Sequence, residues 1–219
     1  MDKTLIVVSG LPRTGTSMVM RMLMEGGVEI VTDGLRSSDE CNPHGYFELE
    51  KVKTIPDDAS WLKCHCGKAV KIVSELLEQL PADINYKVIF MERNLAEVIA
   101  SQQKMLTMMG VPVHFDGGQL TGIYENHLIE VKSNLRERPN CDVLCLNYNE
   151  VIENPHAASL KIIHFLSIPL DAEKMAAAVD IDLYRNRAEA AISAKKEETN
   201  STETDKAELI NKLKSLGYM

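Results

Sequence analysis

The sequence predicts a single α/β domain built on a parallel β-sheet that is covered by helices on both sides. Two observations carry this prediction. Short, unbroken apolar runs recur along the chain, and such runs are typical of parallel strands that are buried on both faces. Segments with helical periodicity separate the runs, and strands that alternate with helices imply crossover connections. We therefore expect three layers, with the sheet in the middle.

Each expected strand is a short apolar run, and each expected helix is a longer segment with apolar residues on one face. The strands are expected at residues 4–8, 28–31, 68–73, 87–91 and 142–146. The helices are expected at residues 16–25, 74–80, 95–109, 120–136 and 156–165. Residues 33–60 are mostly polar and irregular, and long loops of this kind in a compact domain are commonly functional or mobile.

Three segments are expected along the chain. Residues 1–190 form the α/β domain, residues 191–206 are polar and flexible, and residues 207–219 form an amphipathic helix. The apolar face of that helix could dock on its own domain or on a second copy, which leaves a homodimer open.

The composition excludes several classes of protein. With 45% hydrophobic and 26% charged residues, the 219-residue chain resembles an ordinary soluble globular protein. Its net charge of -8 argues against nucleic acid and against highly anionic polymers as partners. No apolar stretch is long enough to span a membrane. The odd number of cysteines, 5, and the lack of a signal-peptide core favour reduced thiols and a cytoplasmic location.

The segment Gly10 to Ser17 has the spacing of a phosphate-binding P-loop, G-x-x-x-x-G-K-[ST], and lies between an expected strand and an expected helix. The turn directs backbone N–H groups inward, and the helix presents the positive end of its dipole. Arg13 adds a permanent charge, and Thr14, Thr16 and Ser17 add hydroxyl groups. The alternative, a plain strand-to-helix turn, does not require two glycines at this spacing.

The usual lysine of the P-loop is Thr16 in this chain. No expected strand ends in the aspartate that would hold Mg²⁺ in a nucleotide kinase. A small-molecule kinase that uses ATP therefore lacks two of its expected parts. Cys64-His65-Cys66 does not have the spacing of a zinc site, so we expect no metal.

Pro12-Arg13-Thr14-Gly15-Thr16-Ser17 resembles the 5′-phosphosulfate-binding loop of sulfotransferases that use 3′-phosphoadenosine 5′-phosphosulfate (PAPS), which reads P-[KR]-[ST]-G-[TS]-[TS]. Residues 88–94 followed by Ser101 resemble the 3′-phosphate-binding element of that family. Residues 42–48 resemble the N-P-x-G-[YF]-[FW]-E segment of its short bacterial-type members. Residues 146–166 and 182–187 resemble later segments, in the expected order.

The resemblance implies a fold like that of the P-loop nucleoside triphosphate hydrolases and transfer of a sulfuryl group from PAPS to an acceptor, without a metal. Pro12, Arg13, Thr14, Gly15, Thr16 and Ser17 would bind the 5′-phosphosulfate, and Arg93 and Ser101 the 3′-phosphate. Arg185 and Arg187 could replace a 3′-phosphate segment, R-K-G-x-x-G-x-W-K, that the chain lacks. Arg13 would also stabilise charge during transfer.

The reaction needs a base for the proton of the acceptor. Glu48, at the end of the N-P-x-G-Y-F-E segment, is our first candidate, and His44 is the second. Either residue could instead be a solvated surface side chain, and Glu48 could cap the next helix. Besides the kinase, a nucleotide-binding module without catalysis is a rival interpretation. The acceptor is not identified, although an aromatic content of 5% disfavours a wide aromatic pocket.

Overall fold

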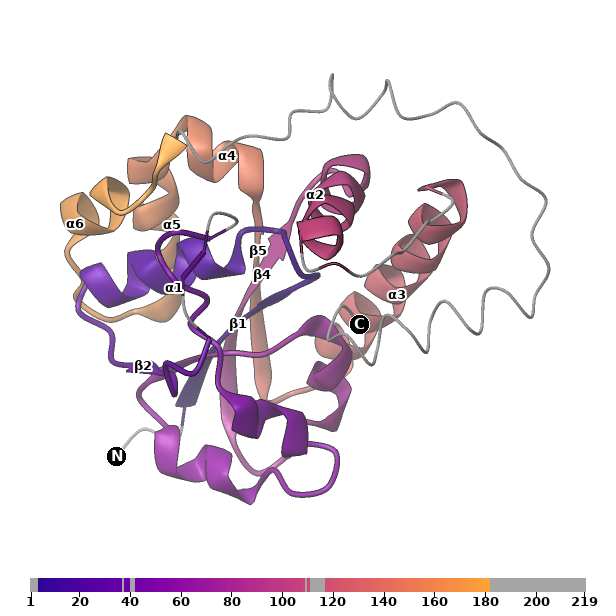
Figure 1. Cartoon of the computed structure of the whole chain (residues 1–219). Helices are drawn as coiled ribbons and strands as arrows, with labels where there is room; N and C mark the ends of the chain where they lie inside the picture. The colour runs from indigo at the N-terminus through magenta and orange to yellow at the C-terminus, as the bar shows by residue number, and fades with distance from the viewer. Residues whose placement is uncertain (1–3, 37, 40–41, 109, 111–116, 182–219) are drawn as a thin grey trace.

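The computed structural model describes residues 4–36, 38–39, 42–108, 110 and 117–181 (Figure 1). Its centre is a five-stranded sheet in the order β2-β3-β1-β4-β5, in which every neighbouring pair is parallel. The strands are β1 (Thr4–Gly10), β2 (Ile30–Val31), β3 (Ala69–Lys71), β4 (Asn85–Glu92) and β5 (Cys141–Asn147). This parallel sheet confirms the predicted fold class.

Helices connect the strands and cover the sheet (Figure 1). The α-helices are α1 (Thr16–Glu25), α2 (Leu95–Met108), α3 (Gly117–Glu137), α4 (Tyr148–Glu153), α5 (Pro155–Leu166) and α6 (Ala172–Ala177). Three 3₁₀ helices, η1 (Glu50–Thr54), η2 (Ser60–His65) and η3 (Ser74–Gln79), lie on the path from β2 to β4.

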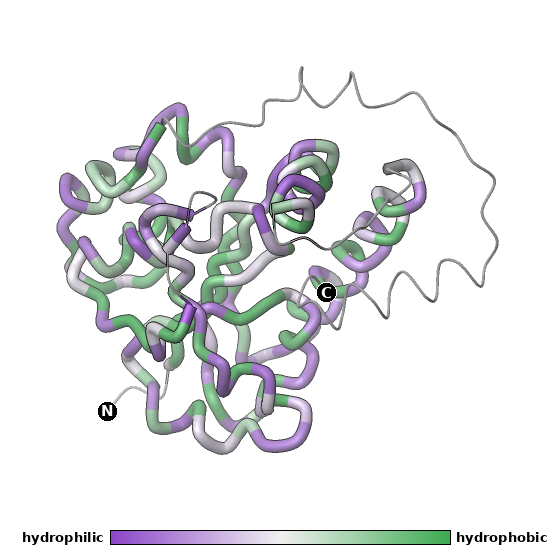
Figure 2. Tube along the Cα trace, viewed as in Figure 1, coloured by the Kyte–Doolittle hydropathy of each residue, from purple (hydrophilic) through white to green (hydrophobic). Residues whose placement is uncertain are grey.

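The two faces of the sheet carry separate apolar cores, which makes the predicted three layers. Ile6 and Val8 of β1 pack with residues of α1, α5 and α6, whereas Leu5 and Val7 pack with residues of η2, η3 and α3. This alternation follows from the two-residue period of a strand. Figure 2 shows the apolar character concentrated along the central strands.

The expected elements are present with shifted ends, and several short ones were missed. The segment expected as a helix at residues 74–80 is the 3₁₀ helix η3, and the irregular segment 33–60 contains η1. Helices α4 and α6 have six residues each, too few to show a clear period. Both begin at a side-chain cap, from Asn147 and Asp171. The predicted segment 191–206 and helix 207–219 lie outside the described residues.

The sheet order places β1 between β3 and β4, so the carboxyl ends of these three strands meet at one edge. From β1 the chain continues to β2 on one side of the sheet, and from β4 it continues to β5 on the other side. Ligands of open α/β sheets bind at such a switch point. The P-loop-like segment, Lys71 and Arg93 all lie at this edge, because they follow or end β1, β3 and β4.

Candidate active site

The loop between β1 and α1 is a tight turn that depends on its glycines. Thr14 closes it, with its N–H and Oγ1 donating to the Leu11 carbonyl at 3.2 and 2.7 Å. Gly10 has φ 145°, and a Cβ there would lie 2.5 Å from the Met91 carbonyl oxygen. Gly15 has φ 95° and caps α1. The loop therefore directs the first turn of α1 toward the strand ends, as an oxyanion-binding loop requires.

Arg13 links the loop to Ser101 of helix α2. Its backbone has φ 77°, an uncommon conformation for a residue with a side chain. Its Nε donates a hydrogen bond of 3.0 Å to Oγ of Ser101, which is 4% exposed. The two segments that the sequence assigned to different phosphates of one nucleotide are thus in direct contact.

Arg93 supports the loop from the end of β4. Its Nη1 donates to the Arg13 carbonyl at 3.2 Å, its Nε donates to Glu97 at 2.8 Å, and its guanidinium lies 4.2 Å from the centre of the Tyr148 ring. The side chains of Arg93 and Glu97 are 7% and 0% exposed. This buried pair holds the Arg13 backbone in its unusual conformation.

Further hydrogen bonds fix both ends of the loop. The Pro12 carbonyl accepts from Nε2 of Gln102 at 3.0 Å, and Oε1 of Gln102 accepts from the Tyr124 hydroxyl at 2.7 Å. At the other end, Ser17 donates to the Tyr46 carbonyl at 3.2 Å and accepts from Nδ2 of Asn42 at 3.1 Å. Ser17 therefore joins the phosphate loop to the segment that carries Glu48, and Thr16 is buried beside it.

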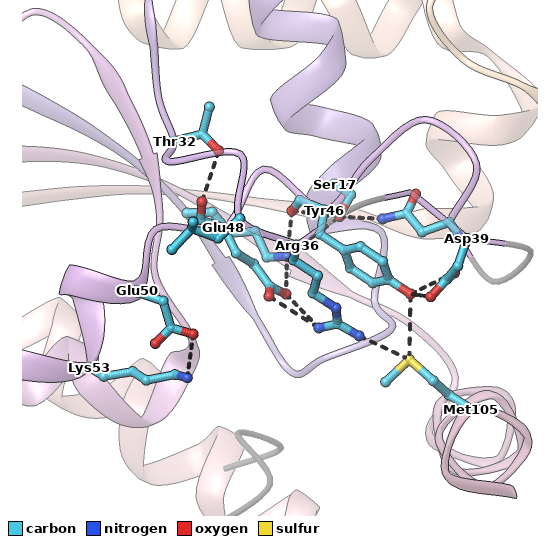
Figure 3. Close-up of polar contacts among 12 residues, drawn as sticks. Ser17, Thr32, Arg36, Asp39, Tyr46, Glu48, Glu50, Lys53 and Met105 are labelled. Carbon is cyan, nitrogen blue, oxygen red and sulfur yellow. Dashed lines mark hydrogen bonds and ion pairs between the residues drawn. The ribbon is translucent and has the colours of Figure 1, made fainter. Parts of the chain in front are cut away.

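Glu48 lies between the cations Arg36 and Lys71, and Figure 3 shows its contact with Arg36. Nη1 of Arg36 is 3.1 Å from each carboxylate oxygen, and Nζ of Lys71 is 3.2 Å from Oε1. The Lys71 ammonium also donates to the Tyr46 carbonyl at 2.9 Å and lies 3.5 Å from the Ser17 hydroxyl. Lys71 thus contacts both the candidate base and the candidate donor loop.

Burial lowers the pKa of Lys71, and the neighbouring carboxylate of Glu48 acts in the opposite direction. The sequence analysis did not select Lys71 or Arg36. The sequence did contain one signal for Lys71. A cation there follows apolar residues of a buried strand, where a charged side chain is unusual. Arg36 lies in an irregular loop and carried no local signal.

Tyr46 positions the segment that holds Glu48. Its hydroxyl donates to Asp39 at 2.8 and 2.9 Å, and the Arg36 guanidinium lies 3.6 Å from the centre of its ring. Burial and the bond to Asp39 raise the pKa of Tyr46 to about 12, so its phenol stays neutral. Phe47, with φ 52°, then turns the chain before Glu48.

His44 has a different partner from Glu48. Its Nε2 lies 2.9 Å from Oδ2 of Asp180, and the two side chains are 33% and 34% exposed. Arg185 and Arg187, the remaining predicted nucleotide ligands, lie outside the described residues. Among the described residues, no group of three His, Cys, Asp or Glu side chains could hold a metal ion. Within the same part of the chain, no helix has the length and apolar character to cross a membrane.

A glycine-containing loop at a helix start, an arginine on that loop and a carboxylate beside a lysine are features expected of a group-transfer site for an anionic donor. A family model described as "Sulfotransferase domain" matches residues 3–215, which is most of the chain. The chain therefore belongs to the sulfotransferase family and transfers a sulfuryl group. Members of this family use PAPS as the donor.

The chain is also similar to several solved structures. The sulfotransferase domain from the curacin biosynthetic pathway is 13% identical, covers 98% of this chain and 97% of its own, and has a TM-score of 0.46. Sulfotransferase STF9 from Mycobacterium avium is 16% identical, over 88% of this chain and 74% of its own, with a TM-score of 0.47. Retinol dehydratase, in complex with androsterone and inactive cofactor PAP, is 15% identical, over 81% and 64%, with a TM-score of 0.43. No curated protein matches the sequence.

Proposed function

We propose that this sulfotransferase binds PAPS in the loop 10–17 and transfers its sulfuryl group to a hydroxyl or amine, with Glu48 as the general base and without a metal. The contact between Arg13 and Ser101, 3.0 Å long, is the observation that carries the donor site. It supports one nucleotide site in which the 5′ end lies at the loop and the 3′-phosphate near Arg93 and Ser101.

The proposed reaction is an in-line displacement at sulfur. The acceptor oxygen or nitrogen forms a bond to sulfur, the bond from sulfur to the 5′-phosphate oxygen breaks, and 3′-phosphoadenosine 5′-phosphate (PAP) leaves. Arg13 and the N–H groups of the loop stabilise the negative charge that grows on the leaving phosphate. The acceptor proton passes to Glu48.

Two contacts support Glu48 over His44 as the base. Lys71 connects Glu48 to Ser17 of the donor loop, whereas the described contact of His44 is with Asp180. Lys71 would also stabilise charge on the sulfuryl oxygens while it holds the carboxylate. A cytoplasmic location remains part of the proposal, supported by the odd number of cysteines in the sequence.

The first test is thermal unfolding with PAP, with 5′-AMP and with ATP–Mg²⁺, the PAP samples containing a metal chelator. A ligand that binds only the folded chain raises the unfolding temperature. We expect a clear rise with PAP, little with 5′-AMP, and none with PAP for Arg13→Ala. The exposed Lys53→Ala is the matched control and should respond as the wild type does.

A rise with ATP–Mg²⁺ alone would favour a kinase. If none of the nucleotides raises the unfolding temperature, the donor site is contradicted and a role without catalysis is favoured. A wild-type response in Arg13→Ala would remove Arg13 from the site and leave the nucleotide to other residues.

A further inference from the structure

The carboxylate of Glu48 is already engaged by its neighbours. A carboxylate offers about four lone-pair positions to hydrogen-bond donors. Arg36 occupies one on each oxygen, and Lys71 occupies another on Oε1. An acceptor hydroxyl that must donate its proton to Glu48 therefore competes with these cations. The described contacts leave one position, on Oε2, and loss of the Arg36 contact would free one more on each oxygen for an acceptor.

Arg36 is the cation whose contact with Glu48 is easier to exchange. Its side chain is 37% exposed, compared with 12% for Lys71. Lys71 lies at the end of β3 and is held by the Tyr46 carbonyl, whereas Arg36 belongs to the loop between β2 and η1. Exposed ion pairs are weak and exchange readily with other anions.

An aromatic ring and a sulfur hold the guanidinium of Arg36. The guanidinium lies against the Tyr46 ring at 3.6 Å, and its Nη2 is 3.7 Å from the sulfur of Met105 (Figure 3). The preceding residue, Leu35, is 72% exposed. Both the ring and the sulfur limit the freedom of the guanidinium, which prepares it to accept a carboxylate with both of its outer nitrogens.

From these contacts we infer that Arg36 determines acceptor specificity, because an acceptor that carries a carboxylate replaces Glu48 on the Arg36 guanidinium and thereby releases Glu48 toward its own hydroxyl or amine. The inference rests on the proposed function, because it gives Glu48 the role of base. A neutral acceptor leaves the contact between Arg36 and Glu48 intact, so the base stays engaged. The enzyme then prefers an acceptor that is an acid, because the ion pair between Arg36 and Glu48 is exchanged for one between Arg36 and the acceptor. Arg36 stays paired throughout.

The test measures binding, so it needs no knowledge of the natural acceptor. Benzoate and benzamide have nearly the same shape, and only benzoate is charged. Each is titrated calorimetrically into the full chain in saturating PAP, which occupies the cations of the donor loop. The proteins are the wild type, Arg36→Gln, Glu48→Gln and, as the control, Lys53→Gln. Lys53 is suitable because it also pairs with a glutamate, Glu50, and is 72% exposed.

Benzoate should bind the wild type more tightly than benzamide does. Glu48→Gln should bind benzoate about tenfold more tightly than the wild type, because the competing carboxylate is gone. Arg36→Gln should lose about tenfold or more, and Lys53→Gln should match the wild type. The opposite effects of the two substitutions separate this inference from a purely structural role for Arg36.

Benzoate that binds no better than benzamide in both the wild type and Glu48→Gln would overturn the inference. The same holds if Arg36→Gln binds benzoate as the wild type does. A failure to bind PAP would instead contradict the proposed donor site. In that case the same titrations without PAP still test Arg36, because the comparison between Arg36→Gln and Glu48→Gln does not depend on the nucleotide.

Discussion

The site contains two arginine–glutamate pairs that differ in burial. Arg93 and Glu97, in the region where β4 meets α2, are 7% and 0% exposed, whereas Arg36 and Glu48, in the loop after β2, are 37% and 39% exposed. The buried pair supports the backbone of the donor loop and has no room to exchange. The exposed pair holds a candidate base and can exchange. The same two residue types therefore serve as scaffold in one region and as a replaceable contact in the other.

The largest effect is expected at the chemical step, for Glu48→Gln. Removal of a general base lowers the turnover rate by about 10² to 10⁴-fold. PAP binding should be unchanged, because the described contacts of the Glu48 carboxylate reach the donor loop through Lys71 and not directly. Turnover is measured as PAP formed from PAPS with acceptors bearing hydroxyl or amine groups. Wild-type turnover in this variant would move the role to another residue, and His44→Ala would then be the next variant.

Glu97→Gln should show the cost of breaking the buried pair. It leaves the Arg93 charge buried without its carboxylate, and we expect the free energy of unfolding to fall by about 3 kcal/mol. Urea denaturation measures this change. Glu50→Gln removes the carboxylate of an exposed pair and should change stability little. Equal effects in the two variants would show that burial does not distinguish these pairs.

Lys71 contacts Glu48 and Ser17, and its burial predicts a pH effect. Burial places the folded-state pKa of Lys71 below its ordinary value of 10.5, so the unfolded chain binds more protons between the two values. The free energy of unfolding should therefore rise with pH in that window, by at most about 1.4 kcal/mol per pH unit. At lower pH the cost of burying the charge is constant.

Urea denaturation of the wild type and Lys71→Met across this window measures the contribution of Lys71. The wild type should gain stability relative to the variant as the pH rises toward 10.5. Parallel profiles would mean that Lys71 keeps an ordinary proton affinity despite its contacts.

The smallest effect is expected for the stability of Arg36→Gln. An exposed pair contributes less than about 1 kcal/mol, so the denaturation midpoint should stay close to that of the wild type. Its effect should appear in carboxylate binding instead. A loss as large as that of Glu97→Gln would mean that Arg36 is part of the scaffold, and the comparison between the two pairs would fail.

The proposed donor side could be recognised in the sequence because its information is local. Gly10, Arg13 and Gly15 lie within six residues, and their spacing reflects a turn that only certain residues can form. The strands β1, β4 and β5 were predicted for the same reason, since buried parallel strands are continuous apolar runs. Residue 13 and Ser101, 88 positions apart, were brought into one site only through the family resemblance.

The acceptor side could not be predicted in the same way. Arg36 and Lys71 acquire their roles through contacts with Glu48 that cross 12 and 23 positions of chain and depend on how an irregular loop folds. No period or spacing describes such a loop. Glu48 was selected from the family pattern, but that pattern contains no information about the cations that surround its carboxylate.

The loop that carries Glu48 closes on itself. The Glu48 carbonyl accepts from Thr32 Oγ1 at 2.8 Å and from the N–H of Asp33 at 3.3 Å, and among the described contacts of its carboxylate only Lys71 comes from outside the loop. The segment 32–48 can therefore be treated as one replaceable unit. Exchange of the segment could change the acceptor preference while the strands of the sheet stay unchanged, provided that each replacement returns a carboxylate to Lys71 and the contacts of Asn42 and Tyr46 to Ser17.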